Sequence, residues 1–165
     1  MSRRIMHPSD FSTASQAAFN KAVDMAKADR AELTIVHVLS PVMPVPGDGY
    51  ISPKVYEEIA ASTRAWAQKQ LDKRVATARA AGVRAKGLLM DGIPHEQIVR
   101  AARAKRTDLL VLGTHGRSGL AKLFIGSVAE SVLRGTRTPI LVVRADSAPV
   151  EPQRGAKPAK EPARV

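Results

Sequence analysis

The chain has 165 residues, no cysteine and a formal net charge of +11 at neutral pH. This length fits one domain with a sizeable buried core, and the absence of cysteine excludes disulfides and thiolate metal sites. Aromatic residues make up only 4% of the chain, so we expect a core built from aliphatic side chains. No apolar run approaches the ~20 residues of a membrane span, and the first residues lack the apolar region of a signal peptide. We therefore expect a cytoplasmic protein.

The surplus of lysine and arginine bears on possible partners, because a positive surface attracts polyanions such as nucleotides and nucleic acids. A solvated basic face is the simpler interpretation. The basic residues of the long helix predicted below are spread along it without interleaved aromatic residues that would stack on bases. The sequence therefore favours a solvated face over a specific DNA or RNA partner.

In chain order, the first half alternates strand and helix patterns. Residues 3–7 predict a short strand, and Ser12 or Thr13 would cap a helix that runs to about residue 29. Residues 33–39 are rich in β-branched and apolar side chains and predict a second strand. After a loop with several prolines and glycines, apolar residues at spacings of three and four predict a long helix from 53 to 81 with one core-facing stripe. The stripe consists of Val55, Ile59, Thr63, Ala67, Leu71, Val75 and Ala78.

The second half repeats the alternation. The predicted elements are a strand over 83–90, a helix from Pro94 to about 104, a strand over 108–112, a helix over 128–134 and a strand over 139–143. Gly82 and Gly135 suit the ends of their helices, and Ser127 with Glu130 has the spacing of a capping box. Strands that alternate with helices predict a parallel sheet covered on both faces. In such sheets the ligand crevice lies at the carboxyl ends of the strands, where the winding reverses.

The last residues have a different composition. The segment 146–165 is rich in proline, alanine, lysine and arginine and shows no apolar period. Such a segment does not bury enough apolar surface to offset the entropy of ordering, so we expect a disordered tail. The folded domain is expected to span residues 1–145.

Glycines punctuate the loop between the fourth strand and the last helix: Gly113, Gly116 and Gly126, the last followed by Ser127. Glycine permits close backbone approach, and successive N–H groups beside a helix start form a site for phosphate. Neither Gly-x-Gly-x-x-Gly nor the Walker A pattern is present. By spacing alone, a phosphate site and a purely structural role, in a tight turn and a close helix–sheet contact, remain equally open.

The spacing Gly113-x2-Gly116-x9-Gly126-Ser127 resembles the ATP-binding signature of the universal stress protein family. Residues 7–12, 33–38, 92–98 and 139–143 are similar to further segments of that family, in the same order. The resemblance implies a flavodoxin-like, Rossmann-like three-layer α/β sandwich with a five-stranded parallel sheet in the order 3-2-1-4-5. It also implies ATP binding and a role as a nucleotide-dependent sensor or switch in a stress response.

The same resemblance implies ligand contacts. Asp10 would contact the adenosine end, Val38 would touch adenine through its backbone, and the loop glycines with the start of the last helix would hold ribose and phosphates. The expected contact residues are Pro8, Asp10, Val38, Leu112, Gly113, Gly116, Arg117, Gly126, Ser127 and Val128. A Mg²⁺ or Mn²⁺ ion would enter with the nucleotide, ligated mainly by phosphates and water.

Several of these residues have alternative roles. Asp10 would also serve as a helix N-cap, and the capping box of Ser127 is compatible with phosphate binding. Arg117 would either pair with a phosphate or point into solvent. Among the histidines, His7 replaces an aliphatic residue of the family pattern and would add a polar group near the adenine side, whereas His37 is expected as a strand residue in or near the core.

No paired carboxylates or nucleophile elbow accompany the glycine loop, so we expect no catalytic residues and at most slow hydrolysis. Two other classes stay open: a slow ATPase or nucleotidyl- or phosphoryl-transfer enzyme, and a module that binds another anion or nucleic acid. The resemblance further implies a homodimer through the last strand, Ile140 to Val143, because an apolar edge strand invites pairing with its two-fold mate. Arg144 and the charged tail would instead shield that edge.

Overall fold

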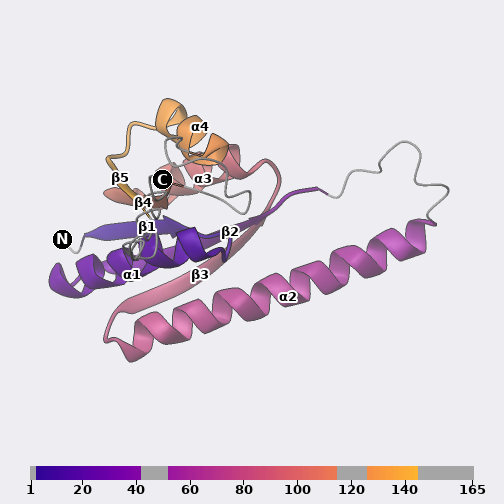
Figure 1. Cartoon of the computed structure of the whole chain (residues 1–165), viewed down its shortest axis with the longest axis horizontal. Coiled ribbons are helices and arrows are strands. Elements are labelled where there is room, and N and C mark those ends of the chain that lie inside the picture. Colours follow the sequence, from indigo (N-terminus) through magenta and orange to yellow (C-terminus); the bar gives the residue numbers. More distant parts are fainter. Residues whose placement is uncertain (1–2, 42–51, 115–125, 145–165) are drawn as a thin grey trace, which may run out of the picture.

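The computed structural model describes residues 3–41, 52–114 and 126–144. Strands and helices alternate along the chain, as the sequence predicts, with boundaries that differ from the expected ones by at most one residue (Figure 1). The elements are β1 (Arg4–Pro8), α1 (Thr13–Ala28), β2 (Glu32–Leu39), α2 (Pro53–Ala80), β3 (Arg84–Asp91), α3 (Pro94–Ala104), β4 (Leu109–Gly113), α4 (Ser127–Gly135) and β5 (Ile140–Val143).

The five strands form one parallel sheet in the order β3-β2-β1-β4-β5, which confirms the predicted fold. In the centre of the sheet, Met6 of β1 is in register with Thr34 of β2 and Leu110 of β4. The chain builds the sheet outward in one direction to β3 and then returns to the other side of β1 with β4. The winding therefore reverses between β1 and β4, and this reversal opens a crevice at the carboxyl ends of these strands.

Helices cover both faces of the sheet. Successive residues of each strand point to opposite faces, so the core consists of two parts, one on each side of the sheet. Ile5 and Val111 pack on one side with apolar residues of α1 and α2. Their chain neighbours Met6 and Leu110 pack on the other side with α3 and α4. Figure 1 shows α1 and α2 on one side of the strands, with α3 and α4 on the other. This near-complete burial explains why the central strands are apolar at almost every position.

The long helix α2 departs from the prediction in its first half. Ala67, Leu71 and the two later stripe residues are buried, whereas Val55 and Ile59 are each 42% exposed. A helix of 28 residues is about 42 Å long, but strands of eight residues span only about 26 Å. The amino-terminal part of α2 therefore runs beyond the sheet (Figure 1), and the predicted continuous core stripe is wrong there.

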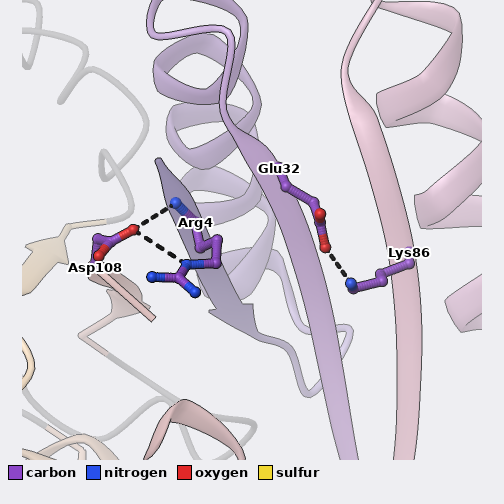
Figure 2. Close-up of polar contacts among 4 residues, drawn as sticks. All are labelled: Arg4, Glu32, Lys86 and Asp108. Atoms are coloured by element: carbon purple, nitrogen blue, oxygen red, sulfur yellow. Dashed lines mark hydrogen bonds and ion pairs between the residues drawn. The ribbon is translucent and has the colours of Figure 1, made fainter. Parts of the chain in front are cut away.

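Polar contacts tie neighbouring strands together at the amino end of the sheet (Figure 2). Asp108, just before β4, accepts hydrogen bonds from the backbone N–H of Arg4 at 2.8 Å and from its Nε at 3.5 Å. Lys86 of β3 pairs with Glu32 of β2. The Arg4 backbone N–H lowers the pKa of Asp108, and the hydrogen bond from Lys86 lowers the pKa of Glu32. Charge pairs thus join neighbouring strands at the amino end of the sheet, while the crevice lies at the carboxyl end.

The end of α2 provides a test of backbone conformation alone. Gly82 has a φ of +86°, and a Cβ added there would meet no atom within 4 Å. Gly82→Ala should therefore lower the free energy of unfolding by about 1 kcal/mol through backbone strain only, and Gly82→Asn by less. Urea denaturation of the three proteins measures this difference. An alanine variant as stable as the parent would contradict the assignment of strain.

Candidate functional site

A cavity of about 420 Å³ lies at the carboxyl ends of β1, β2 and β4. Its volume falls within the range of small-molecule binding sites. The structure places eight of the ten expected contact residues in its lining, and the other two, Gly116 and Arg117, lie outside the described residues. The eight are Pro8, Asp10, Val38, Leu112, Gly113, Gly126, Ser127 and Val128. Four separate segments of the sequence therefore meet at the crevice that the sheet topology defines.

The start of α4 forms one side of the cavity. Gly126 occupies the N-cap position, and its N–H donates to the Thr114 carbonyl at 2.6 Å. The first N–H groups of a helix have no partner within the helix, and a glycine N-cap has no side chain to accept from them. Ser127, Val128 and Ala129 thus carry amide donors in residues that line the cavity. Together with the helix dipole, such donors favour an anion.

The predicted capping box of α4 is wrong. Ser127 is the first residue of the helix rather than its cap, because the chain enters through Gly126 in an extended conformation. The carboxylate of Glu130 accepts from Arg134 Nη2 at 2.7 Å, one turn further along. Within the described part of the chain, no side chain therefore caps the amide donors at the start of this helix.

Asp10 supplies the single carboxylate among the described cavity-lining residues. Its Oδ1 accepts from the backbone N–H of Ser12 at 3.0 Å and from the Ser12 hydroxyl at 2.6 Å. Ser12, not Asp10, caps α1, since its Oγ accepts from the Ser15 N–H at 3.2 Å. A carboxylate offers about four acceptor positions, so Asp10 keeps capacity for the hydroxyl or amino groups of a ligand.

His7 lies in the core rather than beside the ligand. It is fully buried and does not line the cavity, so the prediction that His7 adds a polar group to the site is wrong. Its Nδ1 donates to the Val111 carbonyl at 2.9 Å, which leaves Nε2 as an acceptor for the Ser15 hydroxyl at 3.5 Å. Burial lowers the pKa of His7 to about 4, and the ring is neutral at pH 7. The Ser15 hydroxyl is in turn 2.8 Å from that of Ser9, at the cavity.

His37, which was expected in or near the core, is half-buried and lines the cavity. Its Nδ1 donates to the Ser9 carbonyl at 2.7 Å, and its ring stacks on Phe11 with centroids 4.4 Å apart. Trp66 of α2 also contacts Phe11, with the two ring centroids 5.7 Å apart. Sequence reasoning missed Trp66, whose signal was a lone tryptophan within a polar stretch of helix.

Across residues 3–41, 52–114 and 126–144, no group of three or more histidine, aspartate or glutamate side chains is arranged to hold a metal ion. Within the same ranges, no helix combines the length and the apolar character needed to cross a membrane.

The fold and the cavity define a parallel α/β protein with a small-molecule pocket at the point where the sheet reverses its winding. The universal stress protein family matches residues 1–144, and the chain belongs to that family. It is 33% identical over 144 residues to universal stress protein MJ0531 of Methanocaldococcus jannaschii, covering 86% of this chain and 82% of that protein.

Two solved structures show the same architecture. The universal stress protein UspA from Lactobacillus plantarum is 27% identical with a TM-score of 0.73, over 86% of this chain and 97% of that one. A universal stress protein in complex with cAMP is 26% identical with a TM-score of 0.65, over 87% of this chain and 98% of that one.

The buried His7 predicts a pH dependence of stability. Its pKa is lowered from 6.5 to about 4 in the folded protein, so between these values only the unfolded chain binds the proton. The free energy of unfolding should therefore fall as the pH drops from about 6.5 toward 4, by on the order of 3 kcal/mol in total. His7→Asn should be less stable at pH 7 but should lose stability less steeply between pH 7 and pH 5.

Urea denaturation of both proteins at pH 7, 6 and 5 measures this slope. Over that range Glu32 and Asp108 stay ionised, since their pKa values lie below the usual carboxylate values. Parallel slopes for the two proteins would show that His7 is not the group responsible.

Proposed function

We propose that this protein binds ATP in the cavity and acts as a nucleotide-dependent sensor or switch in a cytoplasmic stress response. The observation that carries the proposal is the start of α4, where the Gly126 N-cap leaves amide donors at the cavity. These donors would hold the phosphates, because backbone N–H groups at a helix start favour negative charge. Gly116 and Arg117, which lie outside the described residues, would add to this phosphate side.

The rest of the lining suits the nucleoside. Asp10 supplies acceptors for ribose hydroxyls or the adenine amino group, while Val38 and Leu112 give apolar walls. A similar protein, 26% identical to this one, has been solved with cAMP. An adenine nucleotide is therefore the ligand that both the chemistry of the cavity and the relatives favour.

A divalent cation would depend on the nucleotide. Asp10 is the one carboxylate of the described lining, and its Oδ1 is already engaged by Ser12. One carboxylate fits a Mg²⁺ or Mn²⁺ ion that takes most of its ligands from phosphates and water. When bound, such an ion would neutralise phosphate charge, while the protein's own part is to position the nucleotide.

Binding rather than turnover is the activity that the described residues support. Efficient hydrolysis needs a base placed at the attacking water. His7 is buried in the core away from the lining, and His37 of the lining donates through Nδ1 to the Ser9 carbonyl and stacks on Phe11. Val128 and Leu133 of α4 are exposed apolar residues on the helix whose start would contact the phosphates. A partner protein that binds this surface of α4 would distinguish the nucleotide-bound site from the empty one.

Two substitutions at one position test the role of the backbone amides. Ser127→Pro removes the N–H at the first helical position, where proline is favoured, and the extended Gly126 (φ −57°, ψ 150°) suits a residue before proline. Ser127→Ala keeps the N–H and removes only the hydroxyl. We expect ATP to bind about tenfold more weakly to the proline variant than to the alanine variant, because a hydrogen bond to a charged group is lost.

Isothermal titration calorimetry with ATP and Mg²⁺ measures both affinities, and thermal unfolding confirms that both variants are folded. Equal affinities of the two variants for ATP would contradict a phosphate site at this amide. A parent protein that binds no adenine nucleotide at all would overturn the proposed function itself.

We further propose that the protein is a homodimer in which β5 pairs with its two-fold mate. β5 is an edge of the sheet, in register only with β4 among the described strands, and its four side chains, Ile140 to Val143, are all partly exposed. An unpaired apolar edge favours association, and identical strands would pair through an isologous contact. The alternative, an edge shielded by the exposed Arg144, predicts a monomer.

A charge on the outer side of β5 tests the dimer. Val142 is partly exposed and, unlike its neighbours, packs in neither core cluster. Val142→Lys should therefore convert a dimer to a monomer without unfolding it, and Leu133→Lys on exposed α4 serves as the matched control. Light scattering after size-exclusion chromatography gives the mass, and a dimeric Val142→Lys protein would argue against this interface.

A further inference from the structure

The long helix α2 contributes an aromatic side chain to the cavity. Trp66 and Thr63 line the cavity from this helix, whereas most other lining residues come from strand ends or the starts of α3 and α4. Trp66 is 44% exposed and is the only tryptophan of the chain. A large, partly exposed aromatic ring in the cavity lining is a surface that a planar ligand group would cover.

The part of α2 that carries Trp66 is held beside the cavity. Arg64, two residues earlier, places its Nη2 2.5 Å from Asp91 Oδ1 and 2.6 Å from Asp91 Oδ2. Asp91 ends β3 and is in register with Leu39, which lines the cavity. The ion pair therefore joins this part of α2 to the end of β3, next to the cavity.

Trp66 also contacts other aromatic rings. Its ring plane lies at 82° to that of Phe11, with the ring centroids 5.7 Å apart. Phe11 in turn stacks on His37, with centroids 4.4 Å apart. Phe11 has a φ of 64°, a conformation that is uncommon for a residue with a side chain. The Phe11 N–H donates to Ser9 Oγ at 3.2 Å, and the imidazole that stacks on Phe11 donates to the Ser9 carbonyl. The indole thus packs against an aromatic group whose own contacts fix its position, Phe11 with His37.

We propose that the base of the bound nucleotide stacks on the indole of Trp66, and that this contact makes the chain selective for purine nucleotides. The inference rests on the proposed function, because it assigns the base side of the same cavity. Stacking strength grows with the area of the two rings, so a purine gains more from the indole than a pyrimidine does. Inorganic tripolyphosphate gains nothing from it and binds through the α4 amides alone.

The lone tryptophan reports on its own contact. Fluorescence of the full-length protein, excited at the indole, should be quenched on titration with ATP and much less with UTP. Tripolyphosphate, with its binding followed by calorimetry, should leave the emission unchanged. Emission that does not change while calorimetry shows ATP bound would place the base away from Trp66.

Substitutions separate stacking from simple apolar contact. Trp66→Leu should weaken ATP binding by about tenfold and bring the ratio of ATP to UTP affinity close to one, while tripolyphosphate binding stays unchanged. Trp66→Phe should recover most of the ATP affinity and the preference. Ile59→Ala is the control, because Ile59 is a similarly exposed apolar residue of α2 that does not line the cavity.

The outcomes distinguish this inference from the function on which it rests. If Trp66→Leu binds ATP as tightly as the parent and keeps its preference for ATP over UTP, the stacking role is wrong and the ATP site stands. If the parent binds no nucleotide, both are overturned. A melting temperature of each variant close to that of the parent confirms that affinities are compared between folded proteins.

Discussion

The backbone N–H groups in the first turn of α4 are the groups on which this site depends. A helix cannot satisfy them internally, and the residue that enters the helix, Gly126, has no side chain to do so. The sheet topology decides what they face: the winding reverses between β1 and β4, so the cavity opens beside this helix start. A strand order that placed α4 elsewhere would leave the same glycine and serine without a pocket. At the proposed phosphate site, ligand recognition would thus follow from backbone geometry more than from any one side chain.

The two ends of the sheet have different roles. At the amino end, Asp108 and Glu32 are engaged by Arg4 and Lys86, which join β1 to the start of β4 and β2 to β3 (Figure 2). At the carboxyl end, the strands end among small, polar and aromatic residues that surround the cavity. Ligand binding at the proposed site would need little rearrangement of the core, because the charge pairs lie at the opposite edge and the apolar contacts lie between the layers.

The fold was predictable because each element carried its own local signal. The apolar runs of β2 and β4, the capping serine of α1 and Pro94 at the start of α3 give boundaries that the structure reproduces within two residues. The glycine spacing around Gly113 and Gly126, with the family resemblance, located residues that the structure gathers at one cavity.

What the sequence did not predict depends on distances between elements. A capping box at Ser127 and a core stripe through Val55 are local patterns that tertiary structure overrides, in one case through the Gly126 cap and in the other through the length of α2. His7 and His37 share one face of the sheet: His7 lies opposite Ile35 within the core, and His37 lies two residues beyond Ile35, where the cavity begins. Trp66 reaches the cavity because α2 passes beside it, and no spacing of residues in the sequence predicts that contact.

A crystal structure of the full-length protein grown with ATP and Mg²⁺ would show whether the amides of α4 hold phosphate. We expect phosphate oxygens within hydrogen-bonding distance of the amides at Ser127 and Val128, with the nucleoside end toward Asp10. An empty cavity at saturating ATP, or a nucleotide whose phosphates point away from α4, would contradict it.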